Sequence, residues 1–223
     1  SIFEVNWDGN TYSQTGGPSA MYTTGTNPNY QYSTKMGEDL ENDYEEVIAG
    51  KDAVRSWYGA FIALTDGENT VHCIWKYKMG DTDPTNLDAI RLKDDANWII
   101  YRMADVMLMK AEALIWKGKE NWQEAVDIIN QIRTRANLLE KTIAIDEEDE
   151  SSMMENYLLP ERNIELAAEG KRWYDMIRYA KSKNYAHKSA FIALVQQYNT
   201  TANASWIRSV LQNEYAWYLP IHA

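Results

Sequence analysis

The sequence has little of what marks a disulfide-stabilised, membrane-spanning or nucleic-acid-binding protein. Its 223 residues include one cysteine, Cys73, which excludes an internal disulfide framework. No stretch approaches the ~18 apolar residues of a membrane-spanning helix. Lysine and arginine total 22 against 33 acidic residues, and the net charge of −11 argues against a basic face for nucleic acid or anionic lipid. The 45% hydrophobic and 25% charged residues are typical of a globular protein.

Motifs for metal binding and catalysis are also scarce. The histidines, His72, His187 and His222, are too scattered for a local metal motif. Residues 81–86 resemble the start of a calcium loop, but Asn86 replaces the glycine of the sixth position, which favours a plain turn. No glycine-rich phosphate loop and no Gly-x-Ser-x-Gly sequence is present. We therefore expect no cofactor, no metal ion and no catalytic residue.

Aromatic residues with a polar group are abundant, with 9 Trp and 15 Tyr. Residues 10–34 carry no charge and no Leu, Ile or Val, yet they include Tyr12, Tyr22, Tyr30 and Tyr32. A loop this long within a compact domain is usually functional or disordered, and disordered segments are poor in aromatic residues. The segment is a candidate ligand-binding loop, and packing within the loop is the alternative for each ring.

Hydrophobic periodicity predicts a mostly α fold with long loops and a few short β-strands. Alternating residues predict strands at 1–7 and 71–78. The strongest helical pattern, residues 97–137, predicts a tetratricopeptide-like hairpin of two helices, 98–117 and 121–136, the second capped by Asn121 with Glu124. Further helices are expected at 40–48, at 152–169 with an interruption at Pro160, and at 172–181, 186–198 and 205–213.

Three glutamates, Glu161, Glu165 and Glu169, recur every four residues and are expected on one helix face. Like charges at this spacing repel by ~0.2–0.5 kcal/mol per pair, so basic groups should lie opposite. The arginines near them in sequence are Arg162, Arg172 and Arg178. We predict buried or half-buried arginine–carboxylate pairs that tie helices together. The alternative is a glycosidase that uses two of these carboxylates.

Three blocks of the helical region resemble the SusD/RagB family in order and spacing. Residues 101–113 resemble its R-Y-A-D-V-L-L-M-x-A-E-A helix, and residues 129–136 are similar to its I-N-x-V-R-x-R-A helix. Residues 161–178 resemble its E-R-x-x-E-L-x-x-E-G-x-R-W-x-D-L-x-R signature. Residues 2–5 and 218–221 also resemble its I-F-E-I strand and the start of its Y-L-P-I-P segment. Agreement across three blocks is much more specific than a single motif.

The resemblance implies a cell-surface-exposed outer-membrane lipoprotein that captures glycans or other nutrients. The resemblance also implies that the protein acts as a lid on a SusC-like TonB-dependent transporter, and that it is a binding protein rather than an enzyme. The match covers the C-terminal portion of the family architecture, with a loop-rich aromatic region at 1–96 and a helical region at 97–223. Because residue 1 lies within a predicted strand, we interpret the sequence as a piece of a longer protein, with the lipid anchor outside it.

An oligosaccharide is the expected ligand. An aromatic ring can cover the apolar C–H face of a sugar, and neutral polar groups can bind its hydroxyls. The candidate ligand-binding residues are Trp7, Tyr12, Tyr22, Tyr30, Tyr32, Trp57 and Tyr58. Two other functions stay open: a protein-interaction scaffold that docks on the transporter without a ligand of its own and, less favoured, a glycoside hydrolase.

Overall fold

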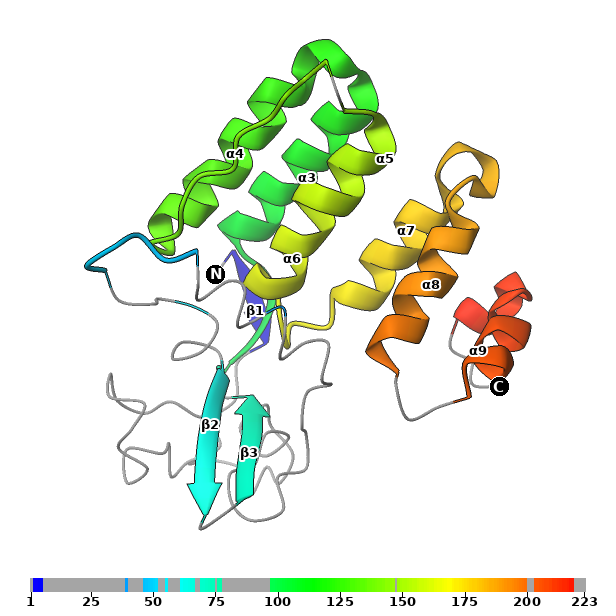
Figure 1. Ribbon diagram of the computed structural model, residues 1–223, viewed down its shortest axis with the longest axis horizontal. Coiled ribbons are helices and arrows are strands. Elements are labelled where there is room, and N and C mark those ends of the chain that lie inside the picture. The colour runs from blue at the N-terminus through cyan, green and yellow to red at the C-terminus, as the bar shows by residue number, and fades with distance from the viewer. Residues whose placement is uncertain are drawn as a thin grey trace.

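Helices predominate in the part of the chain that the computed structural model describes (Figure 1). The described residues are 2–5, 39, 46–51, 55, 61–66, 69–74, 76–77, 97–146, 148–199 and 203–218. The helical elements are, in chain order, α3 (Met103–Lys117), η3 (Lys119–Asn121), α4 (Trp122–Arg135), α5 (Glu150–Ser152), η4 (Met153–Leu158), α6 (Leu159–Glu165), α7 (Arg172–Tyr185), α8 (Lys188–Tyr198), α9 (Ala204–Leu211) and η5 (Glu214–Trp217). The mostly α fold class that the sequence predicts is confirmed.

The predicted hairpin is present as α3 and α4, which lie side by side (Figure 1). Ala111 and Ala125 are fully buried, and their small side chains let two helices approach closely. The indole N–H of Trp122 donates to the carbonyl of Ile115 at 3.0 Å and fixes the start of α4 against the end of α3. The predicted capping box is wrong, because the short helix η3 precedes α4 and the Asn121 side chain makes no cap.

The predicted start of the first helix is also wrong. Residues Trp98–Tyr101 form strand β4 rather than the first turn of α3. Their aromatic and β-branched side chains suit a strand, and β4 pairs antiparallel with β1 (Phe3–Val5) at the N-terminal end of the chain. The short strand expected near the start of the sequence is therefore confirmed, and its pairing draws residues 2–5 to the base of the hairpin.

A second helical segment runs beside α3 as α5, η4 and α6 in succession (Figure 1). Asp149 caps it, because its carboxylate accepts from the backbone N–H of Ser152 at 2.8 Å, so the helix starts at Glu150, earlier than the predicted residue 152. The expected interruption by Pro160 takes the form of the π-helix η4. Because proline has no N–H, the carbonyl of Asn156 lacks its usual partner, which favours wider turns here.

A tight turn at residues 166–170 connects α6 to α7. Gly170 closes it with φ +72°, a conformation that costs glycine little and other residues about 1–2 kcal/mol. Glu169 lies in this turn, so the three glutamates do not share one continuous helix as predicted. The chain then forms α7, α8 and α9, which confirms the helices expected at 172–181, 186–198 and 205–213, with shifted ends.

The remaining described strands, β2 (Phe61–Asp66) and β3 (Asn69–Ile74), form an antiparallel hairpin. The strand predicted at 71–78 is therefore present but ends at Ile74, and residues 76–77 lie in a turn. The helix predicted at 40–48 is wrong at its end, because Val47 pairs with Leu138 in an antiparallel bridge beyond α4. Residues 40–45 lie outside the described chain.

Two apolar clusters hold the helices together. The first joins α3, α4, η4 and α6 around the fully buried Leu108, Ile129 and Met153. The second joins α7, α8, α9 and η5 around Phe191 and Trp217. Among the described helices, none has the length and apolar character to cross a membrane.

Candidate functional site: a buried carboxylate ladder and an adjoining cavity

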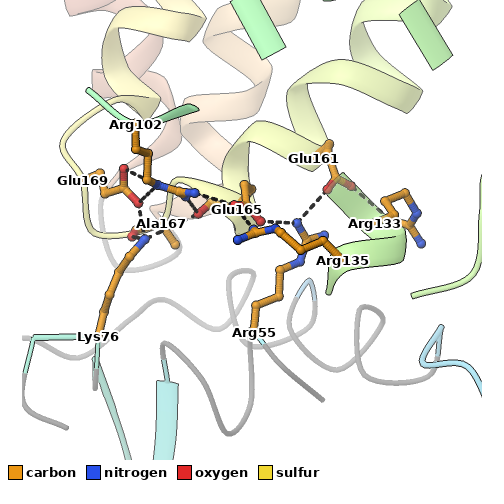
Figure 2. A network of polar contacts seen from close by, with 9 residues as sticks. All are labelled: Arg55, Lys76, Arg102, Arg133, Arg135, Glu161, Glu165, Ala167 and Glu169. Carbon is orange, nitrogen blue, oxygen red and sulfur yellow. Dashed lines mark hydrogen bonds and ion pairs between the residues drawn. The ribbon is translucent and has the colours of Figure 1, made fainter. Parts of the chain in front are cut away.

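Glu161, Glu165 and Glu169 form a row of buried carboxylates, here called the carboxylate ladder (Figure 2). The first two extend from α6, and the third comes from the turn that follows it. Their exposed fractions are 4%, 4% and 3%. Carboxylates are almost never buried to this extent unless they are paired, so the ladder requires cationic partners.

Five basic side chains supply that pairing, and Figure 2 shows them converging on the ladder: Arg55, Lys76, Arg102, Arg133 and Arg135. Arg55 bridges Glu161 at 2.6 Å and Glu165 at 2.8 Å through one nitrogen. Arg102 bridges Glu165 and Glu169, with 2.5 Å from its Nη1 to Glu165 and 2.9 Å from its Nε to Glu169.

The ends of the ladder connect it to distant segments. Lys76 forms an ion pair with Glu169 and also donates to the carbonyl of Ala167 at 3.2 Å. Arg133 of α4 pairs with Glu161 at 3.1 Å, and its other terminal nitrogen pairs with Glu46. The ladder therefore ties α4 and α6 to residues 46, 55 and 76, which belong to the loop-rich part of the sequence.

The charges at the ladder shift the pKa values of its members. Burial alone would raise the pKa of Glu165, but the charges of Arg102 and Arg55 outweigh burial and hold it below its usual value. Burial lowers the pKa of Lys76, and attraction to Glu169 only partly offsets that effect. Burial would lower the pKa of Arg102, yet its two glutamate partners raise it above the usual value.

This arrangement supports a structural role for the ladder. A glycosidase needs one carboxylic acid that holds a proton and a second carboxylate placed across the scissile bond. Glu165 is instead stabilised in its ionised form, and all three glutamates are occupied by cations. The predicted arginine–carboxylate pairs are confirmed, whereas the geometry gives no support to the hydrolase alternative.

A second charged cluster lies close by and uses an arginine that the sequence placed near the ladder. Arg162 donates from Nε to Asp175 at 2.8 Å and from Nη2 to Asp105 at 2.9 Å. Lys171 adds a contact of 3.1 Å to Asp105. Arg162 thus joins α3, α6 and α7 but does not pair with the ladder. Arg178, also named from the sequence, pairs with Glu112 at 2.6 Å.

A half-open cavity of about 500 Å³ adjoins the ladder, because Arg55, Arg133 and Glu161 line both. Its other walls come from η4, α6, the start of α7 and the end of α8. Sequence reasoning missed this cavity. One signal in the sequence could have pointed to this region. Arg133 follows Ile132 on the apolar side of α4, and a charged residue in such a position indicates a buried ion pair.

The ligand-binding residues predicted from the sequence lie outside the described residues. They are Trp7, Tyr12, Tyr22, Tyr30, Tyr32, Trp57 and Tyr58. The nearest described neighbours of the last two in sequence are Arg55 and Phe61, and Arg55 is held by the ladder. Within the described part of the chain, no group of His, Cys, Asp or Glu has a geometry that could hold a metal ion.

Curated relatives of the chain carry the SusD name. The SusD-like protein P38 of Formosa agariphila is 40% identical over 96 residues, which cover 40% of this chain and 18% of the relative. The SusD-like protein P2 of the same organism is 40% identical over 91 residues, or 39% of this chain and 17% of the relative. The aligned segments thus span less than one fifth of the length of either relative.

Solved structures of two SusD superfamily proteins align with the chain. The protein from Parabacteroides distasonis matches 79% of this chain and 38% of its own, at 23% identity and a TM-score of 0.47. The protein from Bacteroides vulgatus matches 58% of this chain and 32% of its own, at 21% identity and a TM-score of 0.41. The sequence profile of the SusD family matches residues 5–223, almost the entire sequence. The chain therefore belongs to the SusD family.

Proposed function

We propose that this chain is part of a nutrient-binding protein of the outer-membrane surface, anchored as a lipoprotein and working with a SusC-like TonB-dependent transporter. It captures an oligosaccharide and passes it to the transporter. The match of the SusD family to residues 5–223 carries this proposal. The abundance of Tyr and Trp in the uncharged segment 10–34 and around it supports a sugar as the ligand.

The carboxylate ladder gives the proposal a physical basis. A ligand-binding loop must be held by a scaffold whose own side chains are fixed. Arg55 and Lys76 anchor the loop-rich region at two points, and each is bonded to carboxylates that are almost completely buried. In this proposal, residues 1–96 carry the ligand-binding loops and residues 97–223 form the support. The site comprises Trp7, Tyr12, Tyr22, Tyr30, Tyr32, Trp57 and Tyr58.

Replacing Tyr12, Tyr22, Tyr30 and Tyr32 together with alanine is expected to weaken glycan binding at least tenfold and to leave the melting temperature unchanged. Each substitution removes a ring on which a sugar can stack. We expect the parent to bind glycans with a Kd in the ~mM to μM range. Retention on glycan columns and a glycan microarray measure the loss. A matched variant, Tyr215→Ala, removes a ring that is 89% exposed on η5 and should bind as the parent does. Unchanged retention by the fourfold variant would disprove this site.

A protein-interaction scaffold is the second candidate, because α3 presents an apolar stripe. Met103, Val106 and Met109 recur every three residues on this helix, and their exposed fractions are 62%, 40% and 40%. Exposed apolar stripes of this kind mark surfaces for protein contact. A scaffold would use this stripe to dock on the transporter without binding sugar.

A Met103→Glu/Met109→Glu double variant separates the two candidates. If the stripe docks on the transporter, the variant should capture at least tenfold less of the SusC-like protein in a pull-down, because two charges would be buried without partners. Glycan binding should be unaffected. Gln123→Glu, a charge placed on the polar face of α4, is the control. Equal capture by both variants would rule out docking through α3.

A further inference from the structure

The cavity beside the carboxylate ladder has the dimensions of a small-molecule site. Its volume of about 500 Å³ falls within the ~300–1,000 Å³ of ligand pockets in proteins. Its walls come from helices of both apolar clusters, α6 from the first and α8 from the second. The apolar clusters hold these two helices in place on either side of the cavity.

The charged groups of the wall balance and largely neutralise one another. Among the described lining residues, four are basic and four acidic: Arg55, Arg133, Lys141, Arg172, Asp39, Glu46, Glu155 and Glu161. Glu161 binds two arginines, Glu46 accepts from Lys141 at 2.9 Å, and Asp39 accepts from the hydroxyl of Tyr198. An anionic or cationic ligand would therefore meet as many repelling as attracting groups, whereas an uncharged polar ligand avoids that repulsion.

One buried donor on this wall lacks an acceptor. Arg172 donates from Nη1 to the carbonyl of Leu159 at 3.0 Å, and its guanidinium lies 5.6 Å from the centre of the Tyr198 ring. Its Nε–H is shielded from solvent and has no acceptor in the described part of the chain. Burial lowers the pKa of Arg172, and Tyr198, Asp175 and Asp39 offset that effect in part. A hydroxyl oxygen of a ligand would satisfy this donor.

The rest of the wall combines apolar surface with free amides. Leu159, Ile164 and Leu194 supply aliphatic surface. Asn156 and Gln197 are exposed residues of the cavity lining, and their side-chain amides make no hydrogen bonds within the described chain. A side-chain amide offers both donors and an acceptor, as a hydroxyl-rich ligand requires. A sugar ring has the same combination, with C–H groups on its faces and hydroxyls around its edge.

We propose that this cavity binds a neutral, polyhydroxylated ring of the hexose type, with Arg172, Asn156 and Gln197 as its hydrogen-bonding groups. The proposal stands on the cavity and its described lining rather than on the function proposed above. The cavity would hold a short piece of carbohydrate, one or two rings, next to the ladder.

Saturation-transfer NMR on the full chain tests this site with methyl α-D-glucopyranoside as the neutral probe and sodium D-glucuronate as the charged one. We expect the glucoside to bind with a Kd in the ~mM range and the glucuronate to bind more weakly. Gln197→Trp should fill the cavity and weaken glucoside binding at least tenfold. Ala193→Trp places the same side chain on an exposed position of α8 outside the cavity and should have no effect.

A second variant, Arg172→Met, removes the unpaired donor and should also weaken glucoside binding. The fourfold tyrosine variant should keep the glucoside signal, which separates failure of this site from failure of the aromatic loop. Three results would overturn the proposal: no saturation transfer to the glucoside at tens of millimolar, tighter binding of glucuronate than of glucoside, or equal losses for Gln197→Trp and Ala193→Trp.

Discussion

Replacing Arg162 with methionine is expected to lower the free energy of unfolding by about 4 kcal/mol. The side chain is 2% exposed and lies between Asp105 of α3 and Asp175 of α7, with both carboxylates also buried. Methionine keeps much of the volume but leaves two buried carboxylates with fewer partners. Breaking a buried pair from one side costs more than the pair contributes, because the remaining charge stays desolvated.

Urea denaturation followed by circular dichroism measures this change. Lys110→Met is the matched control on α3, because Lys110 pairs with Glu124 while both side chains remain more than half exposed. Surface pairs of this kind contribute less than about 1 kcal/mol. Adding Asp105→Asn and Asp175→Asn to Arg162→Met should restore part of the lost stability. A loss for Arg162→Met no larger than that for Lys110→Met would contradict the assignment of Arg162 as the buried link among three helices.

The hairpin and the C-terminal helices could be predicted because their signals are local. Apolar residues at helical spacing mark α4, α8 and α9 without reference to the rest of the chain. The start of α3 could not be located this way. Trp98, Ile99 and Ile100 satisfy both a helical and a strand pattern, and pairing with β1, almost one hundred residues earlier, selects the strand.

The cations of the ladder show why the site was only partly predictable. The need for basic partners follows from three glutamates at four-residue spacing, which is local information. The identity of those partners is not local. Arg55 lies 106 residues from Glu161, and Lys76 lies 93 residues from Glu169. Of the arginines nearest in sequence, Arg162 and Arg178 pair with other carboxylates, and Arg172 donates to the carbonyl of Leu159. Only the fold brings these groups together, so sequence spacing alone pointed to the wrong arginines.

The cavity was beyond sequence reasoning for a similar reason. Its wall combines residues from η4, α6, α7 and α8, and no short motif contains them. The π-helix contributes directly, because Asn156 and Tyr157 belong to its widened turns. Pro160 accounts for that widening, but a proline within a helical pattern predicts only an interruption and not the direction of the side chains around it.

Replacing Glu165 with glutamine is expected to lower the free energy of unfolding by about 3 kcal/mol at neutral pH. The carboxylate accepts from Arg102 and Arg135 at 2.5 Å and from Arg55 at 2.8 Å. Glutamine has the same shape but one neutral oxygen, and its amide N–H groups face guanidinium donors. Arg102 and Arg55 keep Glu169 and Glu161 as partners, so the fold should survive the change. Glu124→Gln on the surface of α4 is the control and should cost less than about 1 kcal/mol.

The effect of this substitution should depend on pH in a direction that the pKa of Glu165 fixes. That pKa is lower in the folded protein than its ordinary value of 4.5, because Arg102 and Arg55 more than offset the effect of burial. A lowered pKa stabilises the folded state fully above the unfolded-state value, and that stabilisation disappears as the pH falls through the folded-state value. Glutamine does not titrate, so the difference between parent and variant should be largest at neutral pH and shrink in acid.

Urea denaturation of parent and Glu165→Gln at about pH 7 and about pH 3 measures the two differences. The two proteins differ at residue 165 alone, so contributions from the rest of the chain largely cancel in the comparison. For Glu124→Gln, the difference in the free energy of unfolding from the parent should not shrink comparably between neutral and acid pH. If the difference between parent and Glu165→Gln stayed constant or grew in acid, the charges of Arg55 and Arg102 would not be stabilising an ionised Glu165. The ladder would then hold helix α6 by packing and neutral hydrogen bonds rather than by ion pairing.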